Sequence, residues 1–170
     1  INIQSGTRTS RMHIEELAEL MAMHPEVEAA SKELGKGKGK HLLLSGLYAS
    51  ARSMLLNAIQ QKTARPMVVV MDNADEAQYM YSDLSAINDK QSTINIPVGI
   101  KVLFFPVSKR RRQGVDEALA IQRTETLSQL AINNEQLTIN MQSGAKASQC
   151  TVIVTYPEAI MESVPAPKAL

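Results

Sequence analysis

The chain has 170 residues, of which 44% are hydrophobic and 21% are charged, and these values are ordinary for a globular domain with a sizeable core. Its formal net charge is +1 and its pI is near 8.0, so the overall charge gives no argument for binding to nucleic acid or to a membrane surface. No apolar run approaches the roughly 20 residues that span a bilayer, so no membrane association is expected.

Cys150 is the only cysteine, which excludes an intrachain disulfide and favours a reducing, cytoplasmic location. It directly precedes an apolar run, so we expect a buried thiol. The chain begins with Ile1 rather than methionine. We therefore expect it to be a piece of a longer protein.

Residues 1–40 are predicted to form an amino-terminal helical arm and a linker. The apolar spacing of residues 12–34 predicts two helices that are separated at the His24-Pro25 step, with Pro25 at the first position of the second helix. The stretch "GKGKGK" at 35–40 offers no apolar surface and a large backbone entropy, which predicts a flexible basic linker.

Residues 41–170 are predicted to form one α/β domain. Four apolar runs without internal alternation each precede a helical pattern, at 42–44, 66–71, 100–106 and 150–156. Such runs are typical of parallel strands that are buried on both faces. A ligand site would then lie at the carboxyl ends of the strands, beside Ser45-Gly46, Asp72-Asn73, Pro106 and Thr155-Tyr156.

Two helix starts in this domain carry their own signals. Asn73 and Glu76 have the spacing of a capping box before the second helix of the domain. Pro157 occupies a first helical position after the last strand. Both signals place the helix immediately after a strand, as an α/β fold requires.

The stretch "GLYASARS" at 46–53 is similar to a phosphate-binding loop of the form G-x-x-x-x-G-K-[ST]. In this frame Gly46 and Ser53 are kept, Ala51 replaces the second glycine and Arg52 replaces the lysine. The methyl of Ala51 restricts the backbone, and the planar guanidinium of Arg52 is bulkier than an ammonium. We predict a degenerate phosphate loop with weak phosphate affinity at most and no hydrolysis.

No residues with catalytic or metal-ligand spacing are found. Asp72 ends an apolar strand, where some nucleotide-binding proteins place an acid for magnesium, but helix capping explains it more simply. The histidines, His13, His24 and His41, are scattered, and we expect them at the surface or at helix caps. No catalytic residue and no metal site is predicted.

Residues 109–123 contain five cations, four of them in one continuous run. The run consists of Lys109, Arg110, Arg111 and Arg112. A solvated loop is the simplest interpretation, and contact with an acidic partner or with phosphate is the alternative; a lone run gives charge without base readout, which disfavours DNA. Arg123 lies in a helical pattern beside Glu117 and Glu125, which predicts a structural ion pair.

Five stretches follow the order of a known family. "ARPMVVVMDNADEAQYMYSDL", at 64–84, resembles the segment after the phosphate-loop helix of the repair helicase UvrB. "LLLSGLYASARSMLLNAI" resembles the degenerate loop in the amino-terminal, UvrB-like module of the bacterial transcription-repair coupling factor (Mfd) family. "FFP", "RTETLSQL" and "TVIVTYPEAIMESVPAP" continue that order, so the resemblance covers residues 41–170.

The coupling factor family is the closer of the two. UvrB proteins have an intact phosphate loop and a tyrosine-rich hairpin, whereas "VSKRRRQGVDEALAIQ", at 107–122, contains no aromatic residue. The resemblance implies a three-layer RecA-like domain that has lost ATP turnover. It would serve as a catalytically inactive scaffold in transcription-coupled nucleotide excision repair, in UvrA recruitment and in autoregulation of the full-length translocase.

The same resemblance implies cofactors and partners. ATP and magnesium belong to the DNA-translocating motor of the full-length family, so no cofactor is expected for this fragment. UvrA would bind an adjacent inserted domain that begins near Leu170. RNA polymerase and DNA would bind other domains. The alternatives are an active ATPase or helicase lobe of the UvrB type, with a glycine and a lysine from another loop, and an α/β domain of unrelated role.

Overall fold

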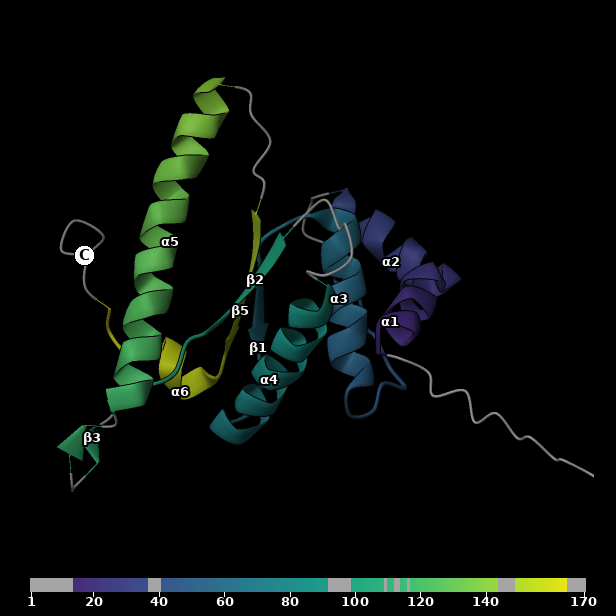
Figure 1. The fold of residues 1–170 in the computed structure, drawn as a ribbon. Helices are drawn as coiled ribbons and strands as arrows, with labels where there is room; N and C mark the ends of the chain where they lie inside the picture. Colours follow the sequence, from purple (N-terminus) through teal and green to yellow (C-terminus); the bar gives the residue numbers. More distant parts are fainter. Residues whose placement is uncertain are drawn as a thin grey trace, which may run out of the picture.

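The computed structural model describes residues 14–36, 41–91, 99–108, 110–111, 114–115, 117–143 and 149–164. These residues form a mixed α/β fold with a small parallel sheet at its centre and helices around it (Figure 1). Within these ranges no helix is long and apolar enough to cross a membrane.

The amino-terminal arm forms the two predicted helices, α1 (Ile14–Met23) and α2 (Pro25–Gly35). Pro25 stands in the first turn of α2, where a missing N–H costs nothing, and His24 caps the helix by accepting the Glu26 N–H at Nδ1 over 3.4 Å. The predicted linker at 35–40 begins inside α2, and residues 37–40 lie outside the described ranges.

The central sheet has three parallel strands in the order β1-β5-β2. The strands are β1 (Met67–Val70), β5 (Gln149–Thr155) and β2 (Gly99–Phe104). Val70 pairs with Thr155 and Phe104 pairs with Val154, so the carboxyl ends of all three strands share one edge. Three of the four apolar runs are therefore confirmed as parallel strands.

The predicted strand at 42–44 is wrong. Residues 41–45 form no helix or strand, none of the described strands pairs with them, and the side chain of Leu43 is 94% exposed. A strand requires a hydrogen-bonded neighbour, which an apolar sequence alone does not provide. The four-stranded sheet is thus a three-stranded one in the described chain, and β1 lies at its edge.

Four helices follow or precede the strands. They are α3 (Ala51–Thr63), α4 (Ala74–Gln91), α5 (Glu117–Ser143) and α6 (Pro157–Ile160). Asn73 Oδ1 accepts the Glu76 N–H over 3.0 Å at the start of α4, and Pro157 stands in the first turn of α6, which confirms both predicted helix starts.

Two apolar clusters hold these elements together. The larger lies between α4 and the sheet, and includes Ala77, Met80, Leu84, Phe104, Val152 and Val154. The smaller lies between α2 and α3, and consists of Val27, Leu55, Ala58 and Ile59. Figure 1 shows α3 between the arm and α4, with α5 on the other side of the sheet.

Candidate functional site

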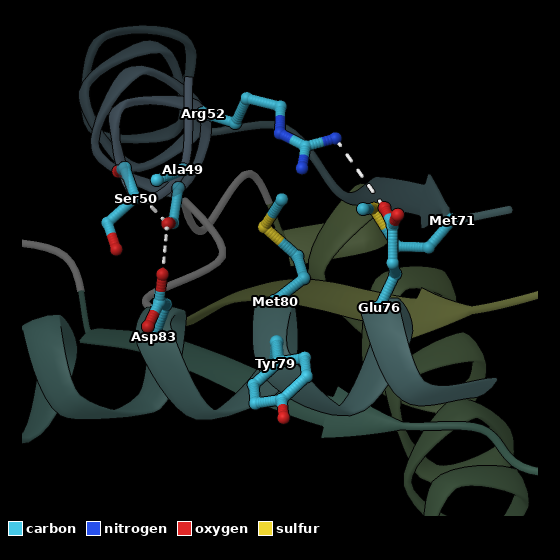
Figure 2. A pocket seen from close by; sticks show the side chains of 9 residues that line it. Ala49, Ser50, Arg52, Met71, Glu76, Tyr79, Met80 and Asp83 are labelled. Atoms are coloured by element: carbon cyan, nitrogen blue, oxygen red, sulfur yellow. Dashed lines mark hydrogen bonds and ion pairs between the residues drawn. The ribbon is translucent and has the colours of Figure 1, made fainter. Parts of the chain in front are cut away.

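The degenerate loop opens onto a pocket of about 440 Å³ between the first turn of α3 and residues 76–83 of α4, close to the carboxyl end of β1 (Figure 2). Its lining residues are Ala49, Ser50, Arg52, Ser53, Met71, Glu76, Tyr79, Met80 and Asp83. This is the edge at which parallel sheets bind ligands. The structure therefore brings the loop to the predicted edge although no strand precedes it.

The loop backbone is arranged as tight turns. The Ala51 N–H donates to the Tyr48 carbonyl over 3.1 Å, and the Arg52 N–H donates to the Ala49 carbonyl over 3.3 Å. In a phosphate-binding loop the corresponding backbone amides are free and point toward the phosphates. Gly46 (φ +79°) and Ala49 (φ +47°) both have left-handed backbones, and Ala49 carries the strain of a β-carbon there.

Arg52 turns to an acid of the same chain. Its Nη1 lies 3.7 Å from Glu76 Oε2 across the mouth of the pocket, and both side chains are partly exposed (Figure 2). At this distance and exposure the pair contributes little stability, at most about 1 kcal/mol. The Glu76 carboxylate nevertheless lies beside the guanidinium, at the place where a phosphate group would have to lie to contact Arg52.

Ser53 is also engaged within the chain. Its side chain is buried, and its hydroxyl lies 2.9 Å from Asp83 Oδ2 and 3.1 Å from the Ser50 carbonyl oxygen. Both neighbours can only accept, so the single hydroxyl proton is shared between them. The hydroxyl that would bind a magnesium ion in a working loop is therefore committed to α4 and to the loop itself.

Glu76 and Asp83 were not predicted as site residues. They lie seven residues apart on α4, with Met80 between them, so all three share one face of the helix and line the pocket. The helical spacing of these two acids was the signal that could have revealed them. Together they make the pocket unfavourable for an anion, because two carboxylates line it beside one arginine.

Asp72 and the three histidines were the other residues considered as possible metal ligands, and none was predicted to bind a metal. Asn73, not Asp72, supplies the cap of α4, and Asp72 is exposed. His24 caps α2 and His41 is exposed, as expected, whereas His13 lies outside the described residues. Over the described ranges, no group of three or more His, Cys, Asp or Glu side chains is arranged to hold a metal ion.

Two residues of the basic run form a short strand. Arg110–Arg111 is β3 and pairs in antiparallel fashion with β4, Gly114–Val115. Lys109 and Arg112 lie outside the described residues. The loop that was expected here therefore contains a hairpin, and a role in binding an acidic partner or phosphate stays a prediction.

Arg123 is the most extensively bonded cation among the described residues, and its predicted partners were wrong. It is only 5% exposed, and its guanidinium donates to the carbonyls of Pro106, Ala159 and Glu162 over 2.6, 3.2 and 3.3 Å. Its Nη1 lies 3.5 Å from Glu162 Oε2. The structural role is as expected, but the acid comes from beyond α6 rather than from Glu117 or Glu125, because folding brings a distant segment to this face of α5.

The thiol of Cys150 is buried in β5, as predicted. Burial is the main cause of a raised pKa for this thiol. The thiol stays protonated at neutral pH. Cys150 is thus a poor nucleophile and is not a candidate catalytic residue.

Comparison with known proteins adds no family or neighbour. No protein family, no curated protein sequence and no solved structure matches the chain.

Proposed function

We propose that this chain is a catalytically inactive, RecA-like scaffold lobe of the transcription-repair coupling factor type. The observation that carries this proposal is the state of the pocket. Arg52 and Ser53, the two side chains that would serve phosphate and magnesium, face Glu76 and Asp83 instead. Phosphoryl transfer needs free cations and a metal at that place, so the pocket supports a structural role rather than turnover.

The family assignment draws its support from sequence. The degenerate loop, the strand and helix of residues 64–84, and the stretches that follow stand in the order of that family. The three parallel strands of the described residues, with the loop at their carboxyl edge, support the RecA-like part of the proposal. In this proposal the lobe is a structural part of a larger, cytoplasmic repair protein, and the motor of that protein binds ATP and magnesium.

The proposal also concerns the partner. UvrA would bind a domain that follows this lobe, while RNA polymerase and DNA would bind other parts of the full-length protein. The lobe itself folds around two apolar clusters, which is sufficient for a domain of this size. It would therefore present the UvrA-binding domain without contacting UvrA itself.

Isothermal titration calorimetry of UvrA against residues 1–170, and against a longer chain that includes the following domain, tests this proposal. We expect saturable binding for the longer chain and none for residues 1–170. Comparable affinity for both would place the docking surface within this lobe. Absence of binding to either chain would contradict the family assignment.

A further inference from the structure

Helix α1 is apolar on two sides. Ala18 faces inward and is 4% exposed, whereas Leu17, Leu20 and Met23 are 40%, 55% and 74% exposed. Helices with apolar residues around most of their circumference are normally covered on more than one side. These three exposed apolar residues, Leu17, Leu20 and Met23, together with Glu19, are called the α1 face below.

The α1 face continues into a groove. A cavity of about 550 Å³ lies between the arm, the 43–47 segment and α3, and Met21, Val27, Leu43, Leu44, Leu47 and Leu55 supply its apolar lining. Met21 stands one helical turn after Leu17, so the groove and the α1 face adjoin on the same helix. The combined surface therefore has an exposed apolar ridge on α1 and an adjoining apolar groove, and a row of side chains on a partner could contact both.

The surface is acidic, although the whole chain has a net charge of +1. Residues 14–36 contain six glutamates and two lysines. Lys32 pairs with Glu28 over 2.8 Å and Lys36 pairs with Glu33 over 2.5 Å, so both lysines are engaged on α2. Glu19 and Glu26 are exposed, and neither has an ion-pair partner among the described residues.

We infer that the α1 face and its groove dock a basic amphipathic helix of a partner protein. Leucine-sized side chains of that helix would enter the groove, and its lysines or arginines would meet Glu19 and Glu26. A second copy of this chain fits the same face poorly, because a two-fold contact would set the glutamates of α1 against one another. An anionic membrane is disfavoured by the same charges.

The inference is independent of the proposed repair function. The α1 face belongs to the arm, and the candidate pocket lies between α3 and α4, so no residue lines both. A chain that fails to bind UvrA or nucleotide can still bind a basic helix through α1.

The test uses the 170-residue chain and a fluorescent synthetic helix of leucine and lysine, about five turns long, with leucines at i, i+3, i+4 and i+7. Fluorescence anisotropy at about 0.15 M salt measures binding. We expect saturable binding that weakens about tenfold or more for Leu20→Ser with Met23→Ser. The pair Glu19→Gln with Glu26→Gln should weaken it as well.

Two controls separate docking from general stickiness. Ile121→Ser removes a comparably exposed apolar side chain from α5 and should leave binding unchanged. A peptide with glutamate in place of every lysine should not bind. Absence of binding, equal binding by the Leu20→Ser, Met23→Ser variant, or self-association through α1 in light scattering would overturn the inference.

Discussion

At the scale of single residues, Arg123 joins the start of α5 to the ends of β2 and α6. The carbon at the centre of its guanidinium also lies 4.1 Å from the centroid of the Phe105 ring. The same group therefore makes a cation–π contact in addition to its hydrogen bonds and its ion pair. The neighbouring Ser108 is bonded to Glu162 through both its N–H and its hydroxyl, which holds that carboxylate near the guanidinium. One side chain thus fixes where the last described segment packs.

We expect Arg123→Met to lower the free energy of unfolding by about 3 kcal/mol or more. The methionine fills similar space, but it takes this donor from the carbonyls of Pro106 and Ala159 and removes the cation beside the Glu162 carboxylate. Urea denaturation followed by circular dichroism measures the change. Glu125→Gln, an exposed position on the same helix, is the control and should stay within about 0.5 kcal/mol. A loss below 1 kcal/mol for Arg123→Met would contradict the anchoring role.

The structural role of Arg123 is predictable from the sequence, but its partners are not. Glu117 and Glu125 were expected as partners because they lie near Arg123 in the sequence, but they stand six residues before it and two after it rather than three or four residues away. Pro106, Ala159 and Glu162 come from other segments, which the fold brings together. The pocket shows the same limit, since Asp83 stands 30 residues after Ser53.

At the scale of elements, the helices were the most predictable part and the first strand was the least. The Pro25 break, the α4 cap and the start of α6 each depend on local chemistry, so their positions follow from the sequence. The run at 42–44 has the composition of a strand, but a strand also needs a neighbour. Composition cannot supply that neighbour.

Helix α3 shows a second limit of periodicity. Its apolar residues predicted one buried face, and Leu55, Ala58 and Ile59 are indeed buried against α2. Ser53, Asn57 and Gln60 are buried as well, on a polar face that periodicity assigns to solvent. The helix is enclosed because the arm covers its apolar face while α4 lies on its other side, where Ser53 meets Asp83. Arg65 secures the arm by donating to the carbonyls of Leu34 and Gly35 over 3.1 and 2.9 Å.

This packing makes a prediction about the arm. Leu55→Ala should destabilise the protein by about 2–5 kcal/mol, because it removes buried methyl groups between α2 and α3. Thermal and urea unfolding measure the loss. Leu43→Ala is the matched control, since Leu43 is almost fully exposed and its loss should change stability by less than about 0.5 kcal/mol. Similar effects of both substitutions would mean that the arm does not share a core with α3.

At the scale of the whole molecule, the described chain is an asymmetric α/β lobe. Val69 of the edge strand β1 is buried, while Val68 and Val70 on its other face are exposed. The contacts between α3 and α4 at the pocket come from Arg52–Glu76 and Ser53–Asp83. In a nucleotide-binding lobe the bound nucleotide would lie between such elements, and here side chains of the same chain take that place.

The most direct test of this account is calorimetric titration of residues 1–170 with ATP and magnesium, combined with an assay of phosphate release. We predict no saturable binding below about 1 mM, which corresponds to about −4 kcal/mol, and no turnover. Restoring the loop with Ala51→Gly and Arg52→Lys should recover some binding but no hydrolysis, because Glu76 and Asp83 still face the loop. Micromolar binding by the unaltered chain, or turnover that Arg52→Ala abolishes, would contradict the claim that this pocket is structural.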